Sequence, residues 1–394
     1  MHTLLKKQFI QKPLAVLLLG CLSVPSFAGQ LKIGDPDSAQ GELSVSGFLR
    51  AKYQDKSWSN NDHKIAFDTA RINLEYKSPT WFGYAEYRCY QFDKLCDFST
   101  LVDGYVGYKI NEQHSVQAGL QPVPFGPGRF WESNYYGGVI TQIGLEDVHN
   151  LGLKYQAKFD QGSKLELGYF SGDGGAYSGP YSDDASRYTT NFVKPEDPSI
   201  SHLDEKNMWI ARFTQTLPNL PEHMTSSLGA SYWYSEVDNK TFDREGDRKA
   251  WAIFGNLAYQ DWTFGLTAGQ NDVDNQDPRS PKASLMGSFD DNFMVANKGT
   301  FYTADVSYTF KRVGPMDMIS PYAMYSLYDK SESGYKDSSR HLVGVAGYYK
   351  DITLVAEYIM GKNDFLIGGP SDAYAQGSDS KTHELVNLQF YYHF

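Results

Sequence analysis

The sequence predicts an all-β protein, a transmembrane antiparallel β-barrel of about 16 strands with short periplasmic turns and long outer loops. Three observations predict this fold class. Apolar and polar residues alternate with a period of two along nearly the whole chain. The alternating segments run to about ten residues, which is enough to cross a bilayer at a tilt. The connections between these segments are alternately short and long.

The composition excludes several other classes. Of the 394 residues, 41% are apolar, 15% are aromatic and 21% are charged, so the chain has too many aromatic residues to be disordered. No apolar run after residue 30 approaches the roughly 20 residues that a spanning helix needs. The abundant Tyr and Phe favour strands over helices. A net charge of −11 argues against a nucleic-acid partner.

Residues 1–28 are predicted to be a cleavable export signal. A lysine-containing start precedes a short apolar core over residues 15–24, and Ser26-Phe27-Ala28 is a small-x-small cleavage site. A lipoprotein site at Cys21 is a second interpretation, in which the apolar core before the cysteine is very short. Cleavage leaves residues 29–41 as an N-terminal periplasmic segment and residues 42–394 as the barrel.

Two cysteines remain after cleavage, Cys89 and Cys96. In an exported protein, two cysteines seven residues apart favour a disulfide, and two free thiols are the alternative. A metal site needs more ligands than these two, and no His pair lies near them in the sequence.

The strands follow one after another from the alternation. The first, 42–54, places Leu43 and Leu49 on one face and Arg50 and Lys52 on the other. The others are 64–77, 80–92, 99–110, 114–122, 149–159, 163–172, 206–216, 225–236, 249–260, 261–270, 299–311, 317–329, 339–350, 351–361 and 382–394. Pro321 is the exception within this pattern, because it removes a ladder hydrogen bond.

The connections divide into two sets. The short set comprises 78–79, 111–113, 160–162, 217–224, 312–316 and the joints at 260–261 and 350–351. The long set comprises 55–63, 93–98, 123–148, 173–205, 237–248, 271–298, 330–338 and 362–381. An even number of strands brings both ends of the barrel to the same rim, so the last strand can pair with the first. Such closure satisfies every backbone group, as lipid requires.

The polar faces of these strands are predicted to line the lumen. The pore-lining charged residues expected there are Arg50, Lys52, Arg71, Arg88, Lys154 and Arg212, with the acidic residues Glu86 and Asp103. Burying so many charges without water would be costly, so the wall predicts a water-filled channel. For each arginine the alternative is a structural salt bridge, for example Arg71 with Glu86 or Arg88 with Asp103.

The loop 123–148 differs from the other long loops. It is rich in Pro, Gly and aromatic residues and poor in charge, so we expect it to fold into the lumen and narrow the pore. The constriction residues would be Pro124, Phe125, Arg129, Trp131 and Tyr135. Packing of this loop at a subunit contact is the alternative.

The acidic excess of the chain is expected in the outer loops. The segment 173–206 is a solvated loop face in one interpretation, and in another it binds divalent cations that bridge to anionic lipopolysaccharide. Asp272, Asp274 and Asp277 resemble a calcium loop only loosely, because the glycine that such a loop needs is missing. No other cofactor is expected.

Two stretches carry a family resemblance. The last strand ends on Phe394 after alternating aromatic residues, and it resembles the C-terminal strand of bacterial outer-membrane barrels, which the barrel-assembly machinery recognises. The stretch from Gln117 to Gly126 (Gln-Ala-Gly-Leu-Gln-Pro-Val-Pro-Phe-Gly) resembles the Gly-Gln-x-x-x-Pro-Phe segment of the phosphate-selective porin O/P family.

The resemblance implies a 16-stranded, homotrimeric diffusion porin in the outer membrane of a Gram-negative bacterium, embedded among lipid and lipopolysaccharide. Small polar solutes, and anions such as phosphate or carboxylates in particular, would cross passively. The arginine ladder of that family would correspond to Arg50, Arg71, Arg88, Arg129 and Arg212, whereas no lysine cluster matches its phosphate trap.

Other functions remain open at this stage. An oligosaccharide porin would use aromatic residues predicted on inner faces and in the loop: Phe48, Phe170, Trp233, Phe254, Tyr322, Tyr328 and Trp131. A barrel enzyme is disfavoured, because no Gly-x-Ser-x-Gly nucleophile motif is present and, apart from His114 and His149 at the first positions of two strands, only His393, His341 and His383 fall within predicted strands. An adhesin or structural barrel would have a plugged lumen, which the charged wall argues against.

Overall fold

The computed structural model describes residues 31–60, 64–92, 94–173, 187–289, 291–379 and 381–394. Within these residues, 16 antiparallel strands form a closed barrel, because β21 pairs both with β20 and with β2. The predicted fold class is therefore confirmed. The predicted export signal and the lipoprotein alternative at Cys21 lie outside the described residues.

The barrel strands have the following bounds: β2 (Gly41–Lys56), β3 (Ala66–Lys77), β4 (Trp81–Tyr90), β5 (Phe98–Lys109), β6 (His114–Pro122), β7 (His149–Lys158), β8 (Ser163–Asp173), β10 (Leu203–Thr216), β11 (Met224–Asn239), β12 (Arg244–Tyr259), β13 (Trp262–Asp274), β16 (Lys298–Tyr308), β18 (Met316–Lys330), β19 (Ser338–Tyr349), β20 (Ile352–Lys362) and β21 (Thr382–His393). The others are β1 (Leu31–Asp35), β9 (Arg187–Phe192), β14 (Ala283–Phe289), β15 (Asp291–Ala296) and β17 (Phe310–Val313), with 3-10 helices η1 (Val139–Ile143) and η2 (Phe365–Ile367).

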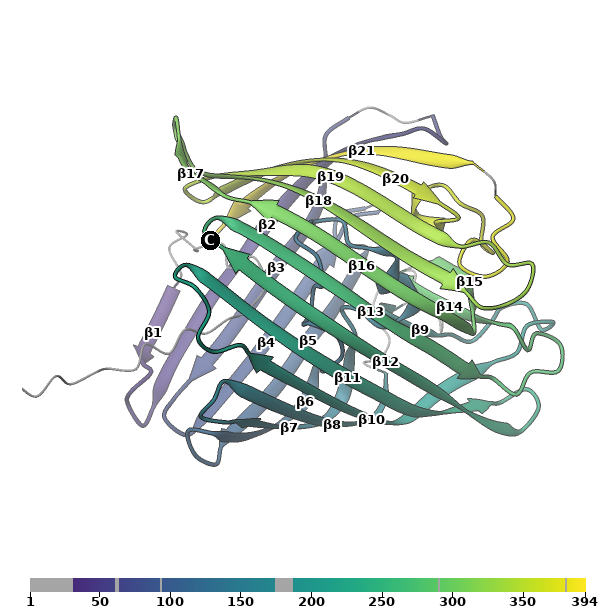
Figure 1. The fold of residues 1–394 in the computed structure, drawn as a ribbon, viewed down its shortest axis with the longest axis horizontal. Coiled ribbons are helices and arrows are strands. Elements are labelled where there is room, and N and C mark those ends of the chain that lie inside the picture. The colour runs from purple at the N-terminus through teal and green to yellow at the C-terminus, as the bar shows by residue number, and fades with distance from the viewer. Residues whose placement is uncertain (1–30, 61–63, 93, 174–186, 290, 380) are drawn as a thin grey trace, which may run out of the picture.

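Short connections gather at one rim and long connections at the other. The C-terminus lies at the rim with the short connections, on the left of Figure 1. The last residue also takes part in closure, since Phe394 and Gly47 exchange two backbone hydrogen bonds of 2.9 and 3.1 Å. These bonds satisfy the backbone at the seam between the first and last barrel strands.

Three local features differ from the sequence prediction. The connection predicted over 237–248 is a tight loop of residues 240–243, because β11 and β12 pair out to Asn239 and Arg244. Part of the segment predicted as periplasmic, 29–41, forms β1, which pairs with β2 beyond the end of β21. Pro321 lies beside the break at Thr309 between β16 and β17, so its missing N–H leaves no gap in a continuous ladder.

The outer face of the barrel is apolar, as the alternation predicts. Leu151, Leu153 and Leu266 are each more than half exposed, whereas their strand neighbours facing inward are polar or buried. Within the described residues, no helix is long and apolar enough to cross a membrane. A continuous exposed apolar surface on a closed barrel is what contact with lipid requires.

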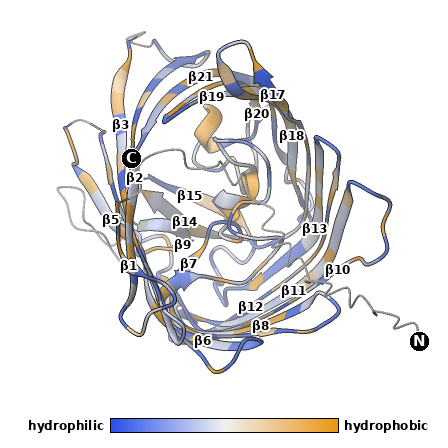
Figure 2. Cartoon of the chain, turned by 90° about the vertical axis from the view of Figure 1, so that its left-hand side faces the viewer, coloured by the Kyte–Doolittle hydropathy of each residue, from blue (hydrophilic) through white to orange (hydrophobic). Residues whose placement is uncertain are grey.

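The interior holds folded chain. Figure 2 shows β9, β14 and β15 inside the ring of barrel strands. These strands come from two long connections and form a small separate sheet in the order β15-β14-β9. β15 is joined in turn to the connection before β21, because Met294 and Ala296 donate backbone hydrogen bonds to Ser371 and Tyr374.

Candidate functional site

The loop 123–148, called the inner loop below, crosses the lumen from β6 and follows the opposite wall. The backbone N–H of Gly126 donates to Ser231 on β11 at 2.9 Å. Further along, the N–H of Tyr135 donates to Glu357 on β20 at 2.9 Å, and the N–H of Val139 donates to Ser326 on β18 at 3.0 Å. The loop therefore lies inside the barrel and covers the wall from β10 to β20.

Two buried arginines hold the carbonyl groups of the same loop. Arg340 on β19 donates to the carbonyl oxygens of Gly137 and Gly138, and Asp364 compensates its charge at 2.7 Å. Arg248 on β12 donates to the carbonyl oxygens of Ile143 and Gly144. Each guanidinium thus satisfies two loop carbonyls that the strands cannot reach.

Apolar packing fixes the first half of the inner loop. Phe125 and Trp131 are nearly fully buried, and their ring centroids lie 5.8 Å from Trp233 and 5.7 Å from Phe301 on the barrel wall. Pro124 is also buried. Gly126 has a positive φ of 63°, and a Cβ there would overlap the ring of Trp131, so only glycine suits the position.

The wall that the inner loop leaves uncovered carries positive charge. The described part of the loop makes no hydrogen bond or ion pair with β2 or β3. On these strands Arg50, Lys52 and Arg71 face the lumen, and together they are called the basic strip. The side chains of Arg50 and Lys52 are 18% and 32% exposed.

A β-bulge supplies the counter-charge of the basic strip. Opposite Arg50 and Ala51, β3 contains one extra residue, Asp68. Strict alternation would turn Asp68 outward, but the bulge turns it into the lumen, where it pairs with Arg50 and with Lys52, the latter at 2.6 Å. The strip therefore has three positive charges against one negative charge.

Arg71 differs from the other inward-facing arginines of the described residues. No carboxylate lies within ion-pair distance of it, and its buried Nε has no hydrogen-bond partner. Its guanidinium lies over the ring of Phe48, with Cζ 4.5 Å from the ring centroid, and Arg88 sits opposite it on β4. Its remaining N–H groups are available to a solute.

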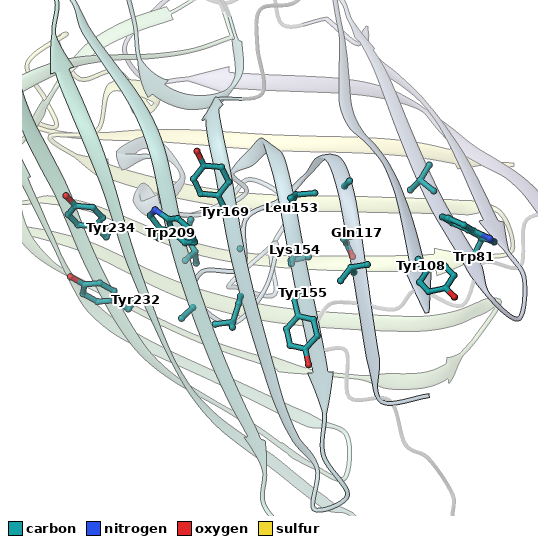
Figure 3. Close-up of a pocket in the computed structure, with 17 residues that line it drawn as sticks. Trp81, Tyr108, Gln117, Leu153, Lys154, Tyr155, Tyr169, Trp209, Tyr232 and Tyr234 are labelled. Carbon is teal, nitrogen blue, oxygen red and sulfur yellow. The ribbon is translucent and has the colours of Figure 1, made fainter. Parts of the chain in front are cut away.

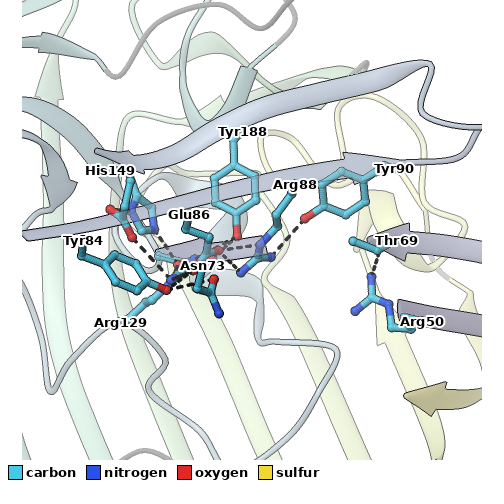
Figure 4. A network of polar contacts seen from close by, with 12 residues as sticks. Arg50, Thr69, Asn73, Tyr84, Glu86, Arg88, Tyr90, Arg129, His149 and Tyr188 are labelled. Atoms are coloured by element: carbon cyan, nitrogen blue, oxygen red, sulfur yellow. Dashed lines mark hydrogen bonds and ion pairs between the residues drawn. The ribbon is translucent and has the colours of Figure 1, made fainter. Parts of the chain in front are cut away.

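Arg88 and Arg129 belong to a compact set of charges, the charge network, formed by Glu86, Arg88, Asp103, Arg129, Asp147 and His149. Figure 4 shows most of it. The fully buried Glu86 accepts from Arg88 Nε at 2.6 Å and from both terminal nitrogens of Arg129 at 2.9 and 3.1 Å. Tyr84 also donates to Glu86. Arg129 therefore ties the start of the inner loop to β4.

The end of the inner loop is tied into the same network. Asp147 accepts from Arg129 Nε at 2.6 Å and from the hydroxyl of Tyr188 at 2.8 Å. Burial would raise the pKa of Asp147, but the charge of Arg129 and the hydrogen bond from His149 outweigh burial and hold this pKa below its usual range. The two ends of the loop are thus bridged by a charged pair.

The remaining predicted pore-lining residues are less accessible. Arg212 pairs with Glu166 and also donates to the carbonyl oxygen of Gly126. Lys154 is buried and donates to the carbonyl oxygen of Pro122 at 3.2 Å. The predicted alternatives of Arg71 paired with Glu86 and Arg88 paired with Asp103 are wrong, because Glu86 binds Arg88 and Arg129, and Asp103 binds His149.

The acidic side of the lumen holds the inner loop. Asp305 and Glu357 accept the backbone N–H groups of Ser133 and Tyr135. Within the loop, burial and the charge of Asp305 raise the pKa of Glu132 to about 7. Burial, together with the charge of Glu132, raises the pKa of Glu146 well above its usual value. These carboxyl groups serve packing and are not exposed to a solute.

The inward-facing aromatic residues are covered as well. Phe48, Phe170, Trp233, Phe254, Tyr322 and Tyr328 each have at most 6% of their surface exposed. Most pack against the inner loop or against one another. The hydroxyl groups of Tyr135 and Tyr348 form a hydrogen bond of 2.7 Å. They do not form an accessible track along the lumen.

Two further predictions concern covalent and metal chemistry. Cys89 and Cys96 are joined by a disulfide at the rim with the long connections.

The three aspartates of the loose calcium motif have separate partners: Asp272 pairs with Lys298, Asp274 accepts from Gln276, and Asp277 accepts from the N–H of Arg279. In the described part of the chain, no three His, Cys, Asp or Glu residues lie close enough to hold a metal ion.

The outer face has a hollow of about 940 Å³ across the strands from β4 to β11. Figure 3 shows Trp81 and Tyr108 at one end and Trp209, Tyr232 and Tyr234 at the other. Smaller residues such as Ala118 form part of its lining. It lies on the apolar outside of the barrel, away from the charged lumen.

Sequence reasoning missed several residues of this site. Asp68 was missed because a bulge changes its direction, and Asp147 and His149 because they stand at the boundary between loop and strand. Arg248 and Arg340 face inward by alternation, so the period of two was a signal that could have found them.

Comparison with known proteins gives the fold context. No protein-family model matches the sequence, and no curated protein matches it. Among solved structures, the outer membrane channel DcaP of Acinetobacter baumannii is 14% identical with a TM-score of 0.57, covering 92% of this chain and 99% of that chain. An anion-selective porin from Comamonas acidovorans is 13% identical with a TM-score of 0.54, covering 90% and 100%.

OmpT, an outer membrane protein of Vibrio cholerae described in a trimer form, is 13% identical with a TM-score of 0.53, covering 90% of this chain and 99% of that chain. At such identities the similarity concerns the fold alone. The chain has the 16-stranded barrel fold that these outer-membrane proteins share.

Proposed function

We propose that this protein is an outer-membrane porin through which small polar anions, such as phosphate or carboxylates, diffuse passively. The observation that carries the proposal is the basic strip: Arg71 has no carboxylate partner, and Arg50 and Lys52 share one aspartate. A surplus of positive charge on a partly exposed wall attracts anions. The fold supports the membrane location, since it is shared with outer-membrane channels.

The path for a solute would lie off centre. The inner loop covers the wall from β10 to β20, and the small sheet packs against β4 and β5 through Tyr188 and Phe289. The inner loop makes no hydrogen bond or ion pair with β2 or β3 within the described residues. A solute would pass between the basic strip and the loop. The fork of Arg71 can offer two parallel N–H groups to a carboxylate or phosphate, and water replaces the solute after it leaves.

An oligosaccharide porin is the alternative, and the structure gives it less support. Sugar recognition would need accessible aromatic faces along the path, whereas the aromatic residues predicted for that role are buried: Phe48, Phe170, Trp233, Phe254, Tyr322, Tyr328 and Trp131. An enzyme that uses His149 as a general base is also disfavoured, because carboxylates hold both of its ring nitrogens.

The assembly around the barrel belongs to the same proposal. We expect a homotrimer, on the ground that a protein of similar fold is known in a trimer form. Lipid and lipopolysaccharide would contact the apolar outside, and the barrel-assembly machinery would insert the chain by its last strand, ending on Phe394. A cleavable export signal at residues 1–28 would bring the chain to that machinery.

Current through purified protein in a planar bilayer tests the proposal. Under a salt gradient, we expect a reversal potential of anion-selective sign, and we expect added phosphate or a dicarboxylate to reduce the chloride current. A cation-selective potential with current blocked by an oligosaccharide would favour the alternative. Folded protein that gives no current would contradict the open channel.

A further inference from the structure

His149 bridges two carboxylates. Its Nδ1 lies 2.7 Å from Asp103 Oδ1 on β5, and its Nε2 lies 2.8 Å from Asp147 Oδ1 at the end of the inner loop. The ring is 2% exposed, so water does not mediate these contacts. A neutral imidazole has one donor and one acceptor nitrogen. A neutral ring can donate to only one of the two carboxylates, and an ionised carboxylate has no proton to donate to the other ring nitrogen. The two contacts are both hydrogen bonds only when one additional proton is bound, as in an imidazolium ring.

The neighbouring groups do not supply that proton. Arg129 donates to Asp147 and to Glu86 and is charged at every accessible pH. Tyr188 on β9 donates to the other oxygen of Asp147 and packs edge-on against His149. Arg88 on β4 is bound to Glu86. With the extra proton the charge network has three positive and three negative charges, and without it the network has a net negative charge.

We propose that His149 is a proton-dependent clamp that holds the end of the inner loop against the barrel wall. When the proton is present, His149 joins the loop residue Asp147 to Asp103 on β5. When it is lost, one ring nitrogen presents a lone pair to a carboxylate less than 3 Å away, and that contact becomes repulsive. Raising the pH would therefore loosen the loop. His149 is a positioning residue, because it acts on the passage through the loop.

Hydrogen exchange of the full-length protein in detergent micelles tests the clamp without reference to current. We expect protection of amides in the inner loop, corrected for intrinsic rates, to fall about tenfold between pH 6 and pH 9, as one charged hydrogen bond is lost. Amides of β12 and β13 serve as the internal reference. Because this measurement does not depend on conduction, its failure is distinguishable from failure of the proposed function.

Variants separate His149 from the other titratable groups. H149Q carries both of its N–H donors on one nitrogen, so it cannot donate from two positions as the ring does, and it cannot titrate; its loop protection should therefore be low at both pH values. H114Q, which changes a histidine bonded to Tyr155 outside the network, should keep the pH step. E132Q/E146Q, which removes the other titratable pair of the loop, should also keep it. An unchanged step in H149Q, or equal protection of the wild type at both pH values, would overturn the proposal.

Discussion

Arg71 and Arg88 lie opposite each other on neighbouring strands, yet their surroundings differ. Arg88 is buried and bound to Glu86, whereas Arg71 has no carboxylate within ion-pair distance and lies over the ring of Phe48. A paired arginine contributes little net field to the lumen, and its hydrogen-bond donors are occupied. An unpaired arginine contributes a full charge and free donors. The residue that acts on a solute is therefore identified by its missing partner.

The substitution R71Q tests this difference. Removing one of the surplus charges should lower the anion-to-cation permeability ratio by roughly tenfold, because a unit charge about 6 Å away in water changes the occupancy of an anion and of a cation by about threefold each, in opposite directions. Reversal potentials in a salt gradient measure the ratio. R71K keeps the charge and should stay close to the wild type, so equal losses in both variants would show that the ratio depends on packing of the guanidinium and not on its charge.

For single residues, the sequence predicted which side of the barrel wall a side chain faces better than it predicted which residue that side chain pairs with. The period of two placed Arg50, Arg71 and Arg88 in the lumen correctly. It could not find Asp68, because a single extra residue in β3 reverses the alternation locally. Nor could it find the partners of Glu86, since Arg129 reaches this residue from a loop 43 positions away.

The inner loop is the element on which the width of the passage depends. Its tip is held by hydrogen bonds from its backbone to Asp305, Glu357 and Ser326, and its first half by the burial of Phe125 and Trp131. Composition predicted that this loop would fold inward, because a segment rich in Pro, Gly and aromatic residues gains from burial. The wall it packs on follows only from the folded structure.

Truncating the packed aromatic residue should loosen this element. W131A removes a side chain that is 4% exposed and packs on Phe301. The lost packing should destabilise the docked conformation of the loop by roughly 3–5 kcal/mol. We expect a higher and more fluctuating single-channel conductance. F130A changes the adjacent residue, which is 43% exposed, and should leave the conductance unchanged. Identical traces for W131A and the wild type would show that the loop does not limit the passage.

The disulfide affects a different element, the connection between β4 and β5. Cys89 and Cys96 are linked with a sequence separation of 7. A cross-link of this size lowers the conformational entropy of the unfolded chain and thereby raises the free energy of unfolding by about 2 kcal/mol. C89S/C96S should therefore melt at a lower temperature in detergent, as followed by circular dichroism. Wild-type protein treated with a reductant should melt like the variant. Equal melting temperatures for oxidised and reduced protein would contradict a stabilising role.

On the scale of the whole molecule, the barrel could be predicted from the sequence and the filling of its lumen could not. Strand number and order follow from a local period that lipid on one side enforces. The small sheet of β9, β14 and β15 forms between segments about 100 residues apart, with no comparable periodic signal. The argument that wall charges require water was also incomplete, because ion pairs such as Arg340 with Asp364 satisfy charges that are fully buried.

The central claim is that a solute passes between the basic strip and the inner loop. Ser46 on β2 faces this uncovered side and is half-buried, whereas Ser231 on β11 is buried and bound by the loop residue Gly126. Both serines can be changed to cysteine with little change in volume, and the two cysteines of the described residues, Cys89 and Cys96, are joined in a disulfide.

The most direct measurement is therefore the effect of a negatively charged thiol reagent on the current through each cysteine variant. The account predicts that the reagent modifies S46C and reduces its current, while S231C keeps its current under the same treatment. Modification of S231C as fast as that of S46C, or no change of current in S46C after modification, would contradict a passage along the basic strip.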